Sequence, residues 1–282
     1  MSHRRPKRSL GQNFLVDPNL QRKIVAAVEA GPGEPVLEIG PGRGALTAHL
    51  ARREVRLTTV ELDDGLAAEL SSRFAGNPRV EVVHGDVLAL ELPALAGDWP
   101  RTTVVGNIPY NITTPIIFRL LRLPYPRDIV LTVQAEVAAR ILAGPGTRTY
   151  GALSVGVRLH ARPARICKVP RSAFRPVPRV NSVVLRITPR SPPRLTPAAA
   201  ADVRVLTRAA FSWRRKQLGT ILTRHADLRV PREIGERVLA RCSLAPALRP
   251  EQLSPDDFIA LAAALQSASS ALSPPARGTR AD

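Results

Sequence analysis

The 282-residue sequence is poor in several residue types, and each shortage excludes a class of protein. Its two cysteines, Cys167 and Cys242, are too few and too far apart for a disulfide scaffold or a zinc module. The five histidines pair at no metal-ligand interval. The longest apolar run, Ile259 to Leu265, is too short to span a bilayer, and the basic N-terminus lacks the apolar core of a signal peptide. We therefore expect a soluble cytoplasmic protein that binds no metal and no membrane.

Negative charge is the second shortage. The 41 Lys and Arg residues exceed the 23 Asp and Glu residues by 18, and all but four of the basic residues are arginine. Excess positive charge of this size favours a polyanionic partner such as nucleic acid, although a GC-rich genome also raises arginine throughout a chain. The distribution separates the two explanations, because codon bias does not remove acids from a single stretch. Residues 137–201 contain no acid and twelve basic residues, so we expect this segment to face phosphates: Arg140, Arg148, Arg158, Arg162, Arg165, Lys168, Arg171, Arg175, Arg179, Arg186, Arg190 and Arg194.

Short apolar runs alternate with longer amphipathic runs over the first half of the chain. Asp17-Pro18 predicts the start of a first helix that ends at Gly31. After it, strands are expected at 35–39, 56–60, 80–83, 102–105 and 129–133, and helices at 45–52, 64–74, 115–121 and 136–142. This alternation predicts an α/β domain with a parallel, doubly wound sheet. The runs 152–159 and 180–187 have no helical pattern between them, so we expect antiparallel strands that complete the sheet.

Residues 189–197 contain four prolines, which predicts a stiff linker, and the sequence pattern differs on its two sides. Beyond it, helical periodicity occurs at 202–211, 216–223, 231–241 and 255–265 without a strand pattern. We therefore expect an α/β domain over residues 1–190 and a small helical domain over 191–266. Residues 267–282 are rich in Ser, Ala, Pro and Gly and are expected to be disordered.

The strongest local motif runs from Val36 to Ala45, an apolar strand followed by a glycine-rich turn and a helix. Gly40 and Gly42 would let a ligand approach the backbone closely. Glu61 ends the second strand, where its carboxylate can accept hydrogen bonds from the hydroxyls of a ribose. A plain strand-to-helix turn is the alternative. The pattern favours a nucleoside-bearing cofactor without saying which one.

Two later motifs favour S-adenosylmethionine over NAD as that cofactor. Asp86 follows the third strand and could accept from the exocyclic amine of an adenine, the alternative being a carboxylate in a surface turn. Residues Gly106 to Tyr110, with the sequence Gly-Asn-Ile-Pro-Tyr, follow the fourth strand and resemble motif IV of the N6-adenine methyltransferases. The order of strands and motifs therefore predicts methyl transfer to an adenine amine.

The residue types in this motif suit that chemistry. Adenine N6 is a poor nucleophile while its lone pair is delocalised into the ring. The Asn107 side-chain carbonyl and the backbone carbonyl of Ile108 or Pro109 would engage its N–H groups and favour a pyramidal nitrogen. Pro109 would fix the turn, and Tyr110 would stack on a base taken out of its helix. We therefore predict Asn107, Pro109 and Tyr110 as the catalytic residues, with catalysis mostly by positioning.

A wider resemblance extends from about residue 7 to residue 266. The sequence resembles the bacterial small-subunit rRNA adenine dimethyltransferases, the KsgA/RsmA family, in seven segments: Gly11 to Leu15, Glu38 to Thr47, Asn107 to Pro115, Gln134 to Ala138, Tyr150-Gly151, Phe174 to Ser182 and Phe211 to Leu218. The resemblance implies a Rossmann-like methyltransferase domain with a small C-terminal all-helical domain. It also implies transfer of four methyl groups from S-adenosyl-L-methionine to N6 of two adjacent adenosines near the 3′ end of 16S rRNA, leaving S-adenosyl-L-homocysteine. The expected substrate is 16S rRNA within an immature 30S subunit, acted on by a monomer without an obligate protein partner.

The resemblance also assigns site residues. It places cofactor contacts at Asn13, Leu15, Gly40, Glu61, Asp86 and Asn107, to which the glycine turn adds Gly42. It makes Phe174 a second aromatic face beside the target adenine, the alternative being an ordinary core phenylalanine. Basic residues expected to contact rRNA are Arg171, Arg175, Arg179, Arg214, Arg215 and Lys216. Three positions depart from the family's usual residues and concern substrate detail rather than the transfer reaction: Thr113, Ala135 and Asn181.

Three other functions compete with this interpretation. A macrolide-resistance methyltransferase would modify one adenosine of 23S rRNA, but residues 150–154 and 211–216 are more similar to the small-subunit enzymes. A binding factor for immature ribosomes, or a transcription factor like some mitochondrial relatives, would not need an intact Asn-Ile-Pro-Tyr motif. A dehydrogenase would need an acid–base partner for hydride transfer, and no histidine lies near a strand end with a carboxylate companion.

Overall fold

The computed structural model describes residues 12–272, with side chains as far as residue 268. The chain divides into two compact units, which are described separately. The first contains the described residues up to Leu142 together with His160–Pro192, and the second contains Ala143–Leu159 and the described residues from Pro193 onward. Gly11, part of the N-terminal motif, lies outside the described residues.

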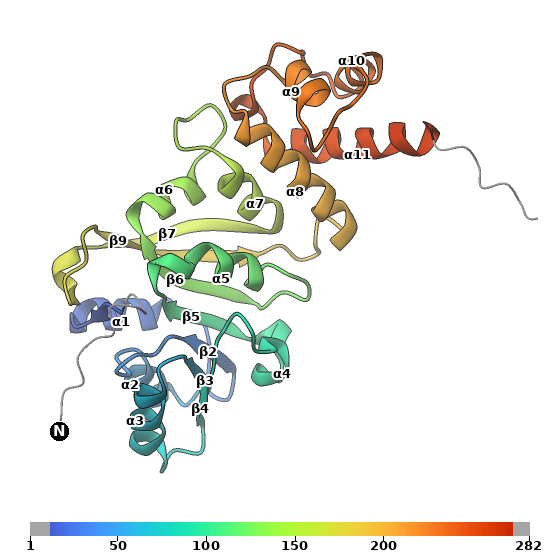
Figure 1. Ribbon diagram of the computed structural model, residues 1–282. Helices are drawn as coiled ribbons and strands as arrows, with labels where there is room; N and C mark the ends of the chain where they lie inside the picture. Colours follow the sequence, from blue (N-terminus) through green and yellow to red (C-terminus); the bar gives the residue numbers. More distant parts are fainter. Residues whose placement is uncertain (1–11, 273–282) are drawn as a thin grey trace, which may run out of the picture. The chain divides into compact units, whose positions relative to one another are not determined.

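The first unit is built on a seven-stranded sheet with the order β4-β3-β2-β5-β6-β9-β7 (Figure 1). Its strands are β2 (Pro35–Ile39), β3 (Arg56–Glu61), β4 (Val80–His84), β5 (Thr103–Asn107), β6 (Asp128–Gln134), β7 (Ala161–Val169) and β9 (Ser182–Pro189). The strands β2 to β6 pair in parallel, whereas β9 runs antiparallel to both of its neighbours. The doubly wound parallel sheet predicted from the alternating runs is confirmed, and the antiparallel strand predicted at 180–187 occurs at Ser182–Pro189.

Helices connect the parallel strands, as this topology requires. The connecting helices are α2 (Thr47–Leu50), α3 (Asp64–Phe74), α4 (Leu92–Ala96) and α5 (Thr113–Leu120), while α1 (Pro18–Ala26) precedes β2 and α6 (Ala135–Leu142) follows β6. Figure 1 shows α2 and α3 on one side of β2 to β4 and α4 on the other. The predicted cap holds, since the Asp17 carboxylate accepts from two backbone N–H groups in the first turn of α1. Short 3₁₀ turns occur at Ala51–Arg53, Trp99–Arg101, Tyr110–Ile112, Arg171–Ala173 and Pro250–Gln252.

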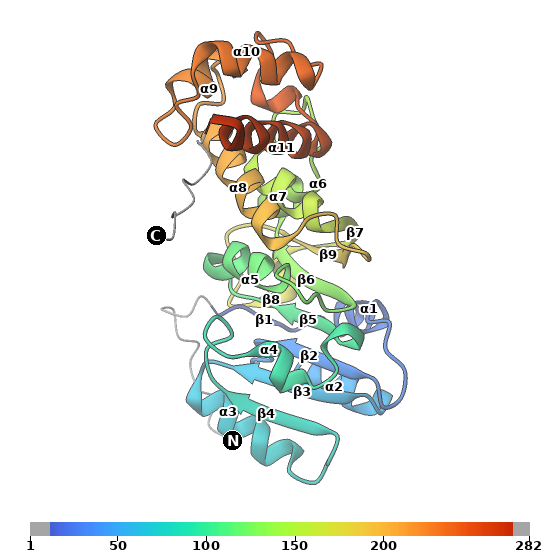
Figure 2. The ribbon, with the colours of Figure 1, turned by 90° about the vertical axis from the view of Figure 1, so that its right-hand side faces the viewer.

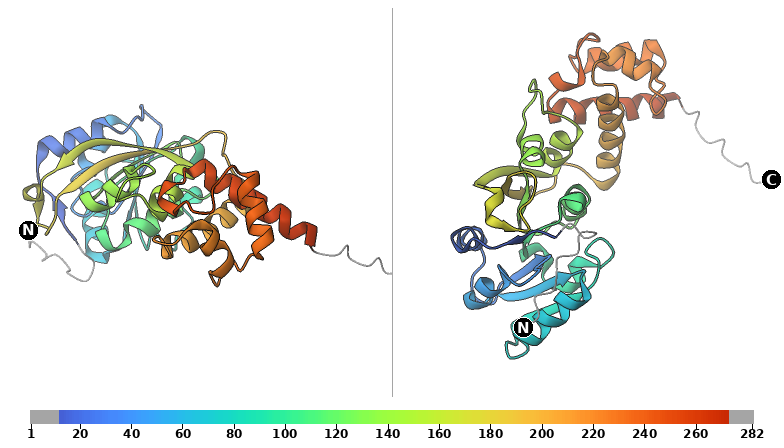
Figure 3. Two further views of the ribbon diagram at one scale, coloured as in Figure 1. Left: turned by 90° about the horizontal axis from the view of Figure 1, so that it is seen from above. Right: turned by 60° about the vertical axis from the view of Figure 1, so that its left-hand side comes forward.

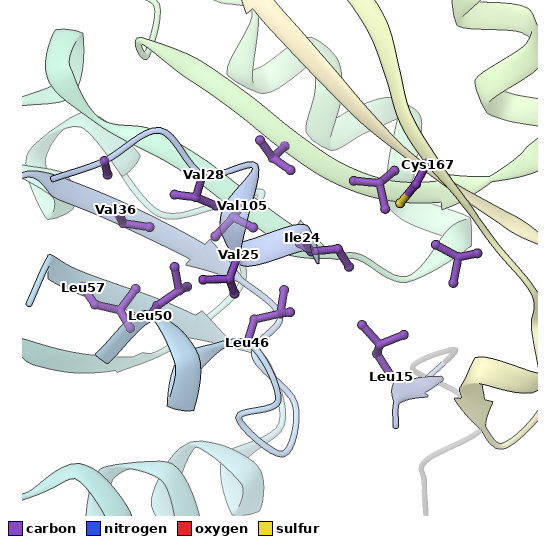
Figure 4. Close-up of a cluster of buried hydrophobic side chains, with 14 of the residues drawn as sticks. Leu15, Ile24, Val25, Val28, Val36, Leu46, Leu50, Leu57, Val105 and Cys167 are labelled. Carbon is purple, nitrogen blue, oxygen red and sulfur yellow. The ribbon is translucent and has the colours of Figure 1, made fainter. Parts of the chain in front are cut away.

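The core of this unit explains why its strands are continuous apolar runs rather than alternating ones. All five residues of β2 are buried, because helices cover both faces of a parallel sheet. On one face, Ile24 and Val25 of α1 and Leu50 of α2 join Val36 and Val105 in one cluster (Figure 4). Each such side chain contributes about 1.5–3 kcal/mol when fully buried.

A separate two-stranded sheet forms from segments far apart in sequence. The strand β1 (Phe14–Leu15) pairs antiparallel with β8 (Phe174–Arg175), and Leu15 lies opposite Phe174. Val16 extends the pairing, since its N–H donates to the carbonyl of Ala173 at 2.8 Å. This sheet fixes the N-terminal segment against the connection that leads to β9.

The second unit is helical, with α8 (Pro197–Ser212), α9 (Leu218–Arg224), α10 (Arg232–Arg241) and α11 (Pro255–Leu272), coloured orange to red in Figures 2 and 3. The Tyr150 and Phe211 rings meet edge to face in its core, and the Tyr150 hydroxyl donates to the Leu253 carbonyl. Residues 267–272 belong to α11, so the disorder expected from residue 267 is wrong for these six positions. The remainder of the expected tail lies outside the described residues.

The strand predicted at 152–159 is also wrong, because these residues form helix α7 (Ala152–His160). The apolar residues Leu153, Val155, Val157 and Leu159 alternate like a strand, and all four are buried. A helix that is buried on most of its surface loses the one-sided pattern by which a helix is recognised. The segment 143–159, assigned to the first domain by sequence, groups with the helical unit. Among the described helices, none has the length and apolar character needed to cross a membrane.

Candidate active site

The glycine turn after β2 has the backbone geometry that its sequence predicts. Gly40, Gly42 and Gly44 have φ angles of 65°, 58° and 75°, a region that other residues occupy only with strain. A Cβ at Gly42 would also lie 3.0 Å from two ring carbons of Phe14, and one at Gly44 would lie 2.8 Å from a Leu70 methyl carbon. The turn therefore needs glycine for conformation and for space.

A cavity of about 310 Å³ opens beside this turn, at the carboxyl edge of the parallel strands. Ligands of doubly wound sheets bind at this edge, and small-molecule sites measure roughly 300–1,000 Å³. The structure brings together most of the site residues predicted from sequence. Those that line the cavity are Asn13, Leu15, Gly40, Gly42, Glu61, Asn107, Pro109, Tyr110 and Arg175.

Two carboxylates line the cavity, and both are buried. Glu61 Oε2 accepts from the Gly42 N–H at 2.9 Å, and Oε1 accepts from the Asp63 N–H at the same distance. Burial raises the pKa of Glu61, while these two N–H groups oppose the shift. The carboxylate is therefore held between the glycine turn and the end of β3, where the sequence predicted it.

Glu38 is the second carboxylate, and sequence reasoning did not select it as a site residue. Its side chain is 1% exposed, and Thr47 Oγ1 donates to Oε2 at 2.7 Å. Burial raises the pKa of Glu38 to about 7; the Thr47 hydroxyl opposes this shift, and the charge of Glu61 adds to it. An acid inside an otherwise apolar strand was the signal available, because buried charges rarely occur without a role. Two acids in one cavity suit a ligand that carries positive charge.

The Asn107 side chain has a fixed orientation. Its Nδ2 donates to the main-chain carbonyl of Asn13 at 2.9 Å, so Oδ1 is the atom of the amide that serves as an acceptor in the cavity. The Pro109 carbonyl is engaged by the next turn, accepting from the Ile112 N–H at 3.3 Å and from Thr113 Oγ1 at 3.4 Å. The Asn-Ile-Pro-Tyr segment thus presents a preset acceptor at the end of β5.

Tyr110 lines the cavity and is half-buried. Its hydroxyl lies 2.7 Å from the Ser182 hydroxyl at the start of β9. Burial raises the pKa of Tyr110, so the phenol stays protonated at neutral pH. The Tyr110 ring is therefore held at one end by its covalent link to the backbone of the motif and at the other by a hydrogen bond to β9.

The N-terminal segment closes one side of the cavity. The Arg43 guanidinium lies 4.8 Å from the centroid of the Phe14 ring, which also packs against Gly42. Gln12 Nε2 donates to Asp63 Oδ2 at 3.4 Å. Sequence reasoning missed Phe14, Gln12 and Arg43 as lining residues. For Gln12 and Phe14 the reason is that the sequence does not indicate which strand a two-residue strand will pair with, whereas Arg43 lies within the glycine turn that the motif did indicate.

Two predicted site residues lie elsewhere. Asp86 follows β4, is exposed and does not line the cavity; its Oδ1 accepts from the Leu88 N–H at 2.8 Å. Phe174 is fully buried in the cluster that contains Leu15, so its ring offers no face for stacking on a base. The stacking role predicted for Phe174 is therefore wrong in this structure, and the alternative of a core phenylalanine holds.

The basic residues predicted to contact rRNA differ in their surroundings. Exposed side chains occur at Arg171, Arg175, Arg179, Arg215 and Lys216. Arg214 instead lies within 3.7 Å of Glu251 and donates to the Thr147 carbonyl. Its charge is partly neutralised within the helical unit.

The acid-free segment is not entirely a phosphate-facing surface. Arg186 lies 3.0 Å from Asp128 and 2.6 Å from Glu29, and Arg194 pairs with Asp256. Acids from outside the segment thus neutralise two of its arginines, so the expectation is wrong for these positions. In the part of the chain that the structure describes, no three His, Cys, Asp or Glu side chains gather as a metal site.

The fold and the cavity define a Rossmann-like domain, in which the glycine turn and the Asn-Ile-Pro-Tyr segment lie at the same sheet edge. Residues 3–252 match the family described as ribosomal RNA adenine dimethylase, and the chain belongs to this family. A relative named ribosomal RNA small subunit methyltransferase A, from Geobacter sulfurreducens, is 44% identical over 274 residues, covering 95% of this chain and 98% of its own. The protein of the same name from Moorella thermoacetica is 42% identical over 270 residues, covering 93% of each chain.

Solved structures agree with this assignment. A dimethyladenosine transferase from Plasmodium falciparum superposes with a TM-score of 0.80 at 28% identity, covering 91% of this chain and 98% of its own. The 23S rRNA methyltransferase ErmE superposes with a TM-score of 0.70 at 30% identity, covering 90% of this chain and all of its own. The first unit is therefore a Rossmann-like methyltransferase domain, accompanied by a C-terminal helical part.

Proposed function

We propose that this protein transfers methyl groups from S-adenosyl-L-methionine to N6 of two adjacent adenosines near the 3′ end of 16S rRNA, dimethylating each. The observation that carries the proposal is the Asn107 amide, whose acceptor atom lies in the same cavity as the glycine turn and two buried acids. Full-length relatives named ribosomal RNA small subunit methyltransferase A support the choice of the small subunit.

The residues of the cavity fit S-adenosylmethionine. Gly40 and Gly42 allow a ligand to approach the turn closely, and the Glu61 carboxylate retains lone pairs for the hydroxyls of a ribose. Burial raises the pKa of both Glu38 and Glu61, and a ligand that carries a sulfonium and an ammonium group would favour their charged forms. S-adenosylmethionine supplies a methyl group on positively charged sulfur, which a nucleophilic nitrogen can accept. Asp86 does not line the cavity, so it would contact the adenine of S-adenosylmethionine only where that adenine extends beyond the cavity.

The chain's contribution to the reaction is positioning. Asn107 Oδ1 would accept one N–H of the target amine, because Nδ2 is committed to the Asn13 carbonyl. The second acceptor would be the Ile108 carbonyl, since that of Pro109 is engaged by Ile112 and Thr113. Two acceptors favour a pyramidal nitrogen with an available lone pair. The proton can leave after transfer, so no general base with a tuned pKa is required.

Recognition of the RNA is assigned to Tyr110 and to exposed arginines. The half-buried Tyr110 ring would stack on the adenine removed from its helix. Arg171, Arg175 and Arg179, with Arg215 and Lys216 of the helical unit, would contact phosphates. The proposed substrate is an immature 30S particle, acted on by a monomer in the cytoplasm.

A 23S rRNA methyltransferase is the second candidate, because the ErmE structure is similar at 30% identity, although the relatives named for the small subunit do not favour it. Purified protein with methyl-labelled S-adenosylmethionine should label 30S particles that lack the modification and leave 50S particles unlabelled. Label confined to 50S particles would refute the proposal and favour the second candidate. Asn107→Ala, which removes the acceptor, is the matched control for contaminating activity.

A further inference from the structure

Ser182 occupies a special position in the sheet. It is the first residue of β9, and it lies opposite Gln134, the last residue of β6, and Val169, the last residue of β7. Because β9 is antiparallel to β6, its first residue lies at the edge where the parallel strands end, which is the edge of the cavity. An antiparallel strand at this position therefore brings a side chain to the site from the opposite direction.

The serine hydroxyl is committed to Tyr110. The Ser182 side chain is fully buried, and its Oγ lies 2.7 Å from the Tyr110 hydroxyl, across 72 positions of sequence. A buried hydroxyl needs a partner, and a bond of this length is a good one. Of the two residues, Tyr110 lines the cavity, as do Asn107 and Arg175, and Ser182 does not.

The start of β9 is itself held firmly. The Arg171 N–H donates to Asn181 Oδ1 at 3.0 Å, and the Ala135 N–H donates to the Asn181 carbonyl at 3.0 Å. Asn181, which departs from the family's usual residue, thus joins the β7–β9 connection to the start of α6. Ser182, the next residue, is therefore a fixed hydrogen-bonding partner for the Tyr110 hydroxyl.

We propose that Ser182 is a positioning residue, which anchors the Tyr110 hydroxyl so that the ring is held beside the target adenine. A tyrosine ring turns about two side-chain torsions. Its hydroxyl oxygen lies on the axis of the second torsion, so a bond to that oxygen restricts the first torsion and fixes where the ring lies. The inference gives the tyrosine hydroxyl a role that a phenylalanine could not fill. It rests on the proposed function, in which Tyr110 stacks on the base.

The test compares variants on both sides of the bond. Ser182→Ala removes the anchor, Ser182→Cys fills the same space with a weak hydrogen-bonding group, and Tyr110→Phe removes the hydroxyl from the half-buried ring. Each should lower kcat on 30S particles about fivefold, the value of one hydrogen bond, with the Kd for S-adenosylmethionine unchanged.

The double variant Ser182→Ala/Tyr110→Phe should have a kcat no lower than that of either single variant, because both substitutions remove the same bond. Ser154→Ala, at a buried serine of the helical unit, is the matched control and should leave kcat unchanged.

Three outcomes would overturn the positioning role: wild-type kcat in Ser182→Ala, multiplicative losses in the double variant, or loss of kcat only in parallel with thermal unfolding. Ser182→Cys and Tyr110→Phe keep the test decisive if Ser182→Ala folds poorly. A second measurement uses an RNA hairpin in which the fluorescent base 2-aminopurine replaces the first target adenosine. Stacking of this base on Tyr110 should quench its fluorescence. Ser182→Ala should reduce this quenching, and unchanged quenching would contradict the role. An inactive wild-type protein would instead refute the proposed function.

Discussion

The Asn107 side-chain amide donates to the main-chain carbonyl of Asn13 at 2.9 Å and so joins two segments 94 positions apart. The same N-terminal segment pairs with β8 and packs Phe14 against Gly42. The site is therefore completed by residues that precede the sheet in sequence. This bond also determines which atom of the Asn107 amide faces the cavity.

Asn107→Ala should abolish methyl transfer while leaving the Kd for S-adenosylmethionine within roughly tenfold, about 1.4 kcal/mol. The substitution removes the acceptor for the target amine but only one contact to the N-terminal segment. Calorimetric titration and single-turnover methylation measure the two effects separately. Normal turnover at saturating cofactor, with binding alone weakened, would show that the role given to Asn107 is wrong.

Asn107→Asp tests the bond to Asn13 itself. The aspartate keeps an acceptor toward the cavity but places an oxygen against the Asn13 carbonyl, where a donor is needed. We expect the free energy of unfolding to fall by about 1–3 kcal/mol. Denaturant unfolding measures this change, and stability equal to that of the wild type would contradict the bond.

Gly42→Ala should reduce cofactor affinity at least tenfold and stability by about 1–2 kcal/mol, because φ is positive and the new Cβ would meet the Phe14 ring at 3.0 Å. Gly76→Ala is the matched control, since no atom lies within 4 Å of its Cβ position and φ is not positive. Calorimetry and thermal unfolding measure both variants. Equal losses of cofactor affinity and stability in the two variants would contradict the role given to the glycine turn.

Glu38 predicts a pH dependence of stability. Its pKa rises from 4.5 to about 7 on folding, so the native state retains a proton that the unfolded chain has already lost. The stabilisation is complete below pH 4.5 and is lost as pH rises to about 7, a change of about 3 kcal/mol. Glu38→Gln keeps an acceptor for Thr47 and should lack this dependence. Urea unfolding of both proteins across this range tests the sign, and parallel curves would contradict it.

The exposed arginines predict a salt dependence. Affinity for rRNA should fall steeply with salt, while affinity for S-adenosylmethionine should change little. Alanine at Arg171, Arg175 or Arg179 should each reduce the slope of log K against log salt by about 1. Arg186→Ala, which breaks the pairs with Asp128 and Glu29, should reduce stability and leave the slope unchanged. Equal slopes for both ligands would attribute the excess arginine to genome composition.

The sequence predicted those features that depend on local chemistry. Three glycines in a turn, an acid that ends the second strand, and Asn-Ile-Pro-Tyr after the fourth all occur where the motifs placed them. Local periodicity also predicted the parallel strands, because β2, β3, β5 and β6 are apolar runs buried over most of their length. Helix α7 was missed because burial around most of its surface made its apolar residues alternate.

Long-range pairing could not be predicted. Nothing in Phe14–Leu15 indicates that it pairs with Phe174–Arg175, and this pairing buries Phe174 and brings Arg175 to the cavity. In the acid-free segment, likewise, two arginines form ion pairs with acids distant in sequence, Asp128 and Asp256. Tertiary contacts, rather than local propensity, decide which arginines remain available for RNA.

The most direct measurement maps the methylated nucleosides by mass spectrometry after reaction of wild-type protein and S-adenosylmethionine with ribosomal particles that lack the modification. We predict N6,N6-dimethyladenosine at two neighbouring positions near the 3′ end of 16S rRNA, and none with Asn107→Ala. Methylated adenosine found only in 23S rRNA, or at a single position, would contradict the proposed function.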